Sequence, residues 1–187
     1  MSRADQERWD ARHTAVSASG EQACLPPDAL RGRLELLPAG GRALELACGR
    51  GAVAVWLAQR GFAVDAVDVS GAGLEAAAAL ATRSGAGDRV RLVAADLDDG
   101  IPASCPGPYD VVVCQRFRDP RLYDAMAARL APGGLLVVTV LSAAGDEPGP
   151  FRAAPGELAA AFGAIAGLQI VSHDEGNGAA SLIARRR

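Results

Sequence analysis

The sequence predicts an α/β fold: a doubly wound, mostly parallel seven-stranded sheet with helices on both faces and an antiparallel C-terminal hairpin. Three observations support this fold class. Strand-like and helix-like segments alternate with short connections, which is typical of parallel βαβ units. Several strand-like segments are nearly continuous apolar runs, as expected for strands covered on both faces. A Gly-Asn-Gly turn at 176–178 joins the last two strand-like segments, which predicts the hairpin.

Prolines and glycines mark the ends of these segments. Pro38 and the Gly40-Gly41 pair end the second helix, and Gly61 is a typical C-terminal cap for the third. The turn Pro132-Gly133-Gly134 leads into the longest apolar strand. In chain order, we expect helices over 3–18, 29–37, 52–60, 73–84, 120–130 and 155–162, and strands over 42–46, 62–67, 90–94, 109–114, 135–141, 168–172 and 179–184.

Size and charge narrow the class of protein. The chain has 187 residues and a formal net charge of −3. This length suits a single domain over 1–187, with 1–37 as an N-terminal helical segment and 38–187 as the core. The acidic balance argues against nucleic acid as a partner. No apolar run reaches the roughly 18–20 residues of a membrane span, and the polar N-terminus does not resemble a signal peptide, so we expect a cytoplasmic protein without a membrane partner.

Two groups of residues receive no chemical role. The four cysteines are scattered and lack the spacing of a zinc site, so we expect no metal; they are Cys24, Cys48, Cys105 and Cys114. The terminal Arg185-Arg186-Arg187 is interpreted as a solvated tail rather than a binding patch.

Polar side chains mark the ends of the predicted strands. Glu45, Asp68, Asp96 and Gln115 fall within or just after four successive strands, so they should collect at one edge of the sheet, where such folds bind ligands. The turn at 47–51 carries glycines that let the backbone approach a polar ligand closely. A buried acid at Glu45 would repel a pyrophosphate but suits a cationic amine. This preference favours an amino-acid-bearing nucleoside over a dinucleotide.

Four motifs resemble those of the class I, seven-stranded and Rossmann-like, S-adenosylmethionine-dependent methyltransferases. Leu44-Glu45-Leu46-Ala47-Cys48-Gly49-Arg50-Gly51 resembles the first motif, an acid followed by Gly-x-Gly-x-Gly. Ala63–Ser70 resembles the second-strand motif, Val93–Leu97 the third, and Leu130–Val138 the stretch that leads into the fifth strand. Their order and spacing agree with the family. Ala47 departs from it by replacing the first glycine, which is tolerable if its φ stays negative.

The resemblance implies S-adenosylmethionine as cofactor and S-adenosylhomocysteine as product. It places Asp68 on both ribose hydroxyls, Val69 on the adenine face and Asp96 on the adenine amino group. The Leu97 backbone N–H would face a ring nitrogen. Glu45 would hold the methionine amino end. The turn residues Ala47, Gly49 and Gly51, together with Gln115, complete the expected cofactor site. Asp68 and Asp96 have an alternative role as helix caps or turn formers.

The segment Arg8-Trp9-Asp10-Ala11-Arg12-His13 resembles the Trp-Asp-x-Arg opening of small bacterial methyltransferases of the tellurite-resistance and thiopurine type. There it forms part of a lid, which implies that Trp9, Arg12 and His13 contact substrate. Arg116 and Phe117, in the loop after the fourth strand, would line the same site. That loop lacks the Asn/Asp-Pro-Pro-aromatic signature of enzymes that methylate nucleobase or glutamine amino groups.

We therefore expect methyl transfer to a small-molecule acceptor by in-line displacement, mainly through positioning. The sequence does not determine a catalytic residue; His13, Gln115 and Arg116 are the candidates. One alternative is a non-catalytic S-adenosylmethionine-binding module. Another is a nicotinamide-dependent oxidoreductase, although the glycine turn fits the dinucleotide fingerprint only with alanines at its first and last glycine positions. The apolar last hairpin leaves both a monomer and a homodimer open.

Overall fold

The computed structural model describes residues 3–17, 23–145, 147–149 and 151–187. The chain forms two compact units, which we describe separately. The first consists of Met1–Pro26 and Ala39–Cys105, and the second of Pro27–Pro38 and Pro106–Arg187. None of the helices in the described ranges is long and apolar enough to cross a membrane.

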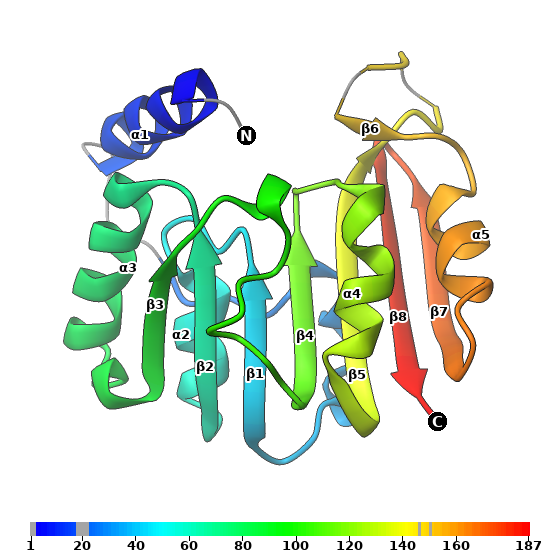
Figure 1. Cartoon of the computed structure of the whole chain (residues 1–187), viewed down its shortest axis with the longest axis horizontal. Coiled ribbons are helices and arrows are strands. Elements are labelled where there is room, and N and C mark those ends of the chain that lie inside the picture. Colours follow the sequence, from blue (N-terminus) through cyan, green and yellow to red (C-terminus); the bar gives the residue numbers. More distant parts are fainter. Residues whose placement is uncertain (1–2, 18–22, 146, 150) are drawn as a thin grey trace. The chain divides into compact units, whose positions relative to one another are not determined.

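The first unit contains three parallel strands in the order β3-β2-β1. They are β1 (Gly41–Leu46), β2 (Phe62–Asp68) and β3 (Val90–Ala94). Helix α2 (Ala52–Ala58) connects β1 to β2, and α3 (Gly71–Arg83) connects β2 to β3. Helix α1 (Arg3–Ser17) lies beyond the arrowheads of β2 and β3 (Figure 1). Two single 3-10 turns, η3 (Gly87–Arg89) and η4 (Leu97–Asp99), flank β3.

Helix α2 is the most deeply buried helix among the described residues of this unit. Every residue from Val53 to Ala58 is buried, because all side chains in this segment are apolar and can pack in the core. Strands β1 and β2 also bury apolar side chains in their second halves, where Leu44, Leu46 and Val67 are fully buried. These adjacent apolar strands hold the polar strand ends of β1 and β2 in register, with Leu46 opposite Val67.

The second unit contains β4 (Tyr109–Gln115), β5 (Leu130–Ser142), β7 (Leu168–Gly176) and β8 (Ala179–Arg186). Their order is β4-β5-β8-β7, with β4 and β5 parallel and β8 antiparallel to both of its neighbours. Helices α4 (Tyr123–Ala128) and α5 (Glu157–Gly163) lie in front of these strands in Figure 1. The antiparallel C-terminal hairpin predicted from the sequence is confirmed.

Several element boundaries differ from the prediction. The expected helix 29–37 consists instead of two 3-10 turns, η1 (Asp28–Leu30) and η2 (Leu34–Leu36), because Gly32 between them has φ +77° and breaks the helical path. The expected helix 120–130 starts as the 3-10 turn η5 (Pro120–Leu122) and ends at Ala128. A two-residue strand, β6 (Arg152–Ala153), pairs with the end of β5 and was not predicted. Residue 18 of the expected first helix lies outside the described residues.

The interpretation of the terminal arginines as a solvated tail is wrong. Arg186 donates from Nη1 to the carbonyl oxygens of Ala127 and Leu130, at 3.0 and 3.1 Å. Arg185 donates to Gly133 O at 2.8 Å and to Leu36 O at 2.9 Å. The guanidinium groups thus satisfy carbonyls at the end of α4, where a helix leaves its last carbonyls without partners, and at the start of β5 and the end of η2.

The aromatic pair Tyr123 and Phe162 generates a stability prediction. Their ring centroids lie 4.6 Å apart, and Phe162 is fully buried. We expect Phe162→Ala to lower the free energy of unfolding by about 3–5 kcal/mol, because it leaves a cavity between α4 and α5. Denaturant unfolding measures this loss. Phe151→Ala is the matched control, since the Phe151 side chain is 61% exposed; equal losses in both variants would contradict the packing described.

Candidate functional site

The carboxylate of Asp68 joins two loops at the carboxyl ends of β1 and β2. Asp68 is the last residue of β2 and is buried. Its Oδ2 accepts a hydrogen bond from Gly49 N at 2.7 Å, and its Oδ1 accepts one from Ser70 N at 2.9 Å. One side chain therefore fixes both the glycine turn after β1 and the start of α3. The turn-forming role that the sequence left open for Asp68 is present.

The turn after β1 has an unusual backbone. Ala47, Gly49 and Gly51 have φ values of 54°, 52° and 77°. The condition under which alanine is tolerable here, a negative φ, is not met, because Ala47 adopts the left-handed conformation in this turn. A non-glycine residue there is strained by roughly 1–2 kcal/mol. Gly51 has no room for a side chain, since an added Cβ would lie 2.7 Å from the Cβ of Ala77 in α3.

Glu45 is a buried acid in the second half of β1. Its side chain is 4% exposed, and Oε2 has no hydrogen-bond partner among the described residues. The backbone N–H of Ala54, in the first turn of α2, donates to the carboxyl group. Burial raises the pKa of Glu45 to about 8, and the nearby Asp68 carboxylate adds to the rise. The site thus contains a buried carboxyl group, one oxygen of which has no partner in the described part of the chain.

The residues expected at the adenine lie at the ends of β2 and β3. Val69 directly follows β2 and is half-buried. Asp96 accepts from Asp98 N at 2.9 Å and caps η4, which is the alternative that the sequence left open. Leu97 is the first residue of η4 and is buried. β3 runs parallel to β2, with Ala94 opposite Asp68, so these residues share the strand edge that carries Asp68.

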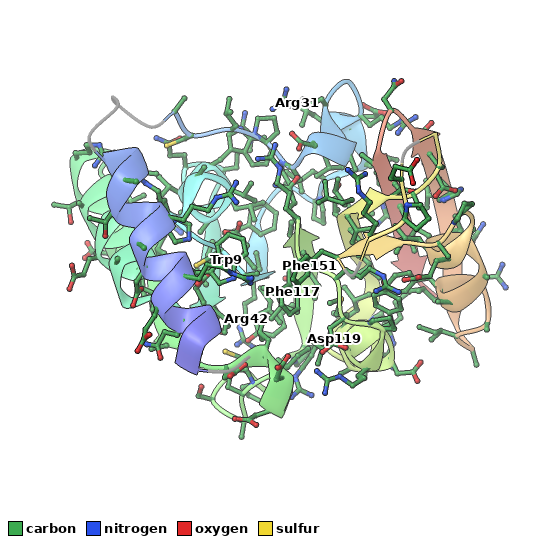
Figure 2. All side chains as sticks on the ribbon, turned by 90° about the horizontal axis from the view of Figure 1, so that it is seen from above. Trp9, Arg31, Arg42, Phe117, Asp119 and Phe151 are labelled. Atoms are coloured by element: carbon green, nitrogen blue, oxygen red, sulfur yellow. The ribbon has the colours of Figure 1, made fainter. Side chains whose placement is uncertain are left out.

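Helix α1 contacts this edge through one short face. Asp10 Oδ1 accepts from Ser70 Oγ at 2.5 Å and from Ala72 N at 3.2 Å. Trp9, labelled in Figure 2, stacks on His13 with ring centroids 6.0 Å apart. A Cβ added at Gly49 would lie 3.2 Å from His13 Cε1, so the imidazole covers the glycine turn. Of the expected lid residues, His13 is therefore brought to the loop after β1, and Trp9 stacks on it.

Burial lowers the pKa of His13. The Asp68 carboxylate raises this pKa, and the Arg50 and Arg12 guanidinium groups lower it further. The lowered pKa favours the neutral imidazole near neutral pH, the form a proton acceptor needs. Arg12 is exposed and lies over the Trp9 ring, with its guanidinium carbon 5.4 Å from the centroid.

Gln115, Arg116 and Phe117 belong to the second unit, at the carboxyl end of β4. The Gln115 side chain accepts from Asp28 N at 2.6 Å. Arg116 is 77% exposed and pairs with the Asp28 carboxylate at 3.5 Å, and its φ is 57°. The half-buried Phe117 follows in the same loop (Figure 2). Gln115 and Arg116 therefore both contact Asp28.

Three charged residues that the sequence did not single out organise the structure around these positions. Asp10 attaches α1 to the start of α3. In the second unit, Glu157 accepts both guanidinium hydrogen bonds of Arg118, at 2.8 and 2.6 Å, together with one from Tyr123 Oη. Glu175 accepts from Ser142 Oγ and Gly156 N. Each contact joins segments far apart in sequence, so no local pattern indicates it.

Comparisons with known proteins show that this chain is similar to methyltransferases. A family model described as "Methyltransferase domain" matches residues 43–134. The ubiquinone biosynthesis O-methyltransferase of Caulobacter sp. (strain K31) is 35% identical over 108 residues, which cover 55% of this chain and 42% of that relative. Its namesake from Psychrobacter cryohalolentis is 31% identical over 109 residues, covering 56% of this chain and 42% of that relative. The chain spans less than half the length of these curated relatives.

Solved structures share the fold across most of the chain. TehB from Haemophilus influenzae aligns with a TM-score of 0.69 and 18% identity over 86% of this chain and 60% of its own. The [4+2]-cyclase SpnF aligns with a TM-score of 0.77 and 17% identity, covering 97% of this chain and 94% of its own. DhpI, solved with S-adenosylhomocysteine, aligns with a TM-score of 0.63 and 22% identity over the same shares. The predicted fold class is thereby confirmed.

The family match over residues 43–134 and the shared fold agree with the resemblance to class I methyltransferases that use S-adenosylmethionine. The residues at the ends of β1 and β2 fit this molecule. An ammonium group would supply the partner that Glu45 Oε2 lacks. A carboxylate has about four lone-pair directions, and Asp68 uses two of them on backbone N–H groups, which leaves acceptors for a diol.

The raised pKa of Glu45 predicts a pH-dependent stability. The folded protein keeps a proton between about pH 4.5 and 8 that the unfolded chain loses. The associated stability is fully present below pH 4.5 and is lost as pH rises towards 8. We expect the ligand-free wild type to lose roughly 2–5 kcal/mol more unfolding free energy than Glu45→Gln between about pH 5 and pH 8. Denaturant unfolding at both pH values measures this; parallel losses would contradict the account.

Proposed function

We propose that this protein transfers the methyl group of S-adenosylmethionine to a small-molecule acceptor by in-line displacement. The observation that carries the proposal is the arrangement at the carboxyl ends of β1 and β2. There the strained glycine turn, the buried Glu45 and the Asp68 carboxylate come together in one compact unit. Strain of this kind is retained at ligand sites. The proposal treats residues 1–187 as one methyltransferase domain.

Each of these residues has a defined part in the proposal. Asp68 accepts the ribose hydroxyls, and Glu45 is the counter-ion of the methionine ammonium. Gly49 and Gly51 permit close backbone approach, with Ala47 completing the turn. Val69 packs against adenine, while Asp96 and the Leu97 N–H bond its edge. Gln115 stays a proposed cofactor residue, although its side-chain oxygen already accepts from Asp28 N.

When bound, the sulfonium supplies an already activated methyl group. The protein therefore contributes mainly position and exclusion of water. His13 is the residue we propose for removing a proton from an acceptor that must lose one, because it is neutral and covers the glycine turn. Trp9 and Arg12 lie on the same helix and would contact the acceptor from the lid.

Apolar side chains at the carboxyl edge of the second unit favour an apolar acceptor. Phe151 is 61% exposed and Leu141 is 44% exposed. Leu141 pairs with Arg152 across β5 and β6, which places Phe151 beside this strand end (Figure 2). Phe117 follows the adjacent strand end, since Gln115 pairs with Thr139. Arg116 would hold an anionic group of such an acceptor. The curated relatives are named O-methyltransferases, so a hydroxyl group is the first acceptor to test.

A non-catalytic S-adenosylmethionine-binding module is the second candidate. The structure of SpnF, described as a [4+2]-cyclase, has a similar fold, so the fold itself does not require methyl transfer. Incubation with methyl-labelled S-adenosylmethionine and a panel of phenols, thiols and amines separates the candidates. Labelled product from any acceptor supports the enzyme, and cofactor binding without product on the whole panel favours the module.

Cofactor affinity should depend on Asp68. We expect Asp68→Ala to weaken S-adenosylhomocysteine binding at least tenfold, because it removes a charged acceptor worth roughly 1.5–3 kcal/mol per hydrogen bond. Isothermal titration calorimetry measures the dissociation constant. Asp124→Ala, which removes an exposed aspartate of α4, is the control. Unchanged affinity in Asp68→Ala would remove Asp68 from the ribose site, and tighter NADH binding by the wild type would favour the oxidoreductase alternative.

A further inference from the structure

Residues 6–15 of helix α1 present little apolar surface with which to dock. Of residues 6–15, whose side chains the structure describes, only Trp9, Asp10 and His13 are partly buried. The others are exposed. Most surface helices are held by an apolar stripe facing the core. Since residues 6–15 show no such stripe, the attachment of this part of α1 to the first unit depends on polar and aromatic contacts.

Asp10 makes the shortest of these contacts. Its Oδ1 accepts from the Ser70 hydroxyl at 2.5 Å and from Ala72 N at 3.2 Å, at the N-terminus of the 13-residue helix α3. The same hydroxyl accepts from Gly73 N at 3.0 Å and caps α3. A carboxylate at this end is also favoured by the helix dipole. A second hydrogen bond to α1 is longer: Arg50 Nη1 donates to His13 O at 3.3 Å.

The Asp10 contact continues directly into the cofactor site. Ser70 donates a hydrogen bond to Asp10 through its hydroxyl group and one to Asp68 through its backbone N–H. Asp68 in turn holds Gly49 N. One turn further along α1, the His13 ring lies on the same glycine turn. The position of α1 and the geometry of the Asp68 carboxylate are thus joined by a continuous series of hydrogen bonds.

We propose that Asp10 is a positioning residue that latches α1 over the cofactor site and thereby slows cofactor release. The latch consists of Asp10, Ser70 and Ala72. When it is made, the His13 ring lies against the loop after β1; when it is broken, the attachment of α1 is weakened. The latch itself rests on the contacts above, and its link to cofactor release rests on the proposed function.

Coupling between the latch and the cofactor follows from linkage. A ligand that orders Asp68 and the Ser70 backbone favours the latched state, and the latched state in turn favours the ligand by the same factor. Loss of a hydrogen-bonded charge shifts such an equilibrium by about 10- to 100-fold. The effect of losing the latch is therefore large enough to be measured on single variants.

Limited trypsin digestion of the ligand-free protein tests the latch itself. Trypsin cleaves after Arg8 and Arg12, which are exposed on α1, and mass spectrometry separates these cuts from all others. We expect Asp10→Ala to raise the cleavage rate at these two sites about 10-fold or more, because cleavage follows the population of the undocked helix. Alanine is a better helix former than aspartate, so faster cleavage would not come from weaker helix propensity.

Two variants keep the digestion test falsifiable. Gln6→Ala removes an exposed polar side chain from the same helix and should leave the cleavage rates near those of the wild type. Asp10→Asn keeps an acceptor oxygen and should fall between the wild type and Asp10→Ala. Equal cleavage rates in the wild type and Asp10→Ala, with unchanged melting temperatures, would overturn the latch.

The link to the cofactor is tested by the dissociation rate of S-adenosylhomocysteine, measured by stopped-flow competition. We expect about 10-fold faster release from Asp10→Ala and a smaller effect in a Ser70→Ala background, because the main partner is then already absent. Faster trypsin cleavage with an unchanged release rate would leave a latch without coupling and overturn this proposal. Failure of the wild type to bind S-adenosylhomocysteine would instead contradict the proposed function, and the digestion result would still stand.

Discussion

The carboxylate of Asp68 is the interaction on which the organisation of the first unit depends. It accepts one hydrogen bond from a backbone N–H of the turn after β1 and one from the backbone N–H of the residue that caps α3. These two loops come from neighbouring parallel strands, so a single buried side chain sets the distance between them. Ser70 extends this arrangement to Asp10 and therefore to α1. The site is built from backbone groups held by carboxylates rather than from a cluster of catalytic side chains.

The sequence predicts those parts of the structure that depend on local pattern. Apolar runs locate the strands, and acids at their ends locate the edge that binds ligand, because side chains at parallel strand ends necessarily meet. Gly49 and Gly51 indicate a turn whose residues have positive φ. Gly32 is an exception. The helix propensity of residues 29–37 taken together predicts one helix, but the positive φ of this single glycine interrupts it.

Contacts between distant segments could not be predicted in this way. Asp10 lies 60 residues from Ser70, and nothing near either residue identifies the other as its partner. The bonds of Arg186 to the end of α4 depend on where the last strand lies, not on the three arginines themselves. Ala47 adopts φ 54° against its own preference because its neighbours on both sides are fixed, by β1 and by Asp68. In each case tertiary structure overrides a local tendency.

The central claim is that the buried, partly unpaired Glu45 is the counter-ion of the cofactor's ammonium group. With its pKa near 8, Glu45 is protonated in the ligand-free protein at neutral pH, and an ammonium beside it would favour the ionised form. Calorimetric titration of S-adenosylhomocysteine at pH 7, in buffers of different ionisation enthalpy, counts the protons released. The account predicts release approaching one proton in the wild type and none in Glu45→Gln. Binding without proton release, or release that persists in Glu45→Gln, would contradict it.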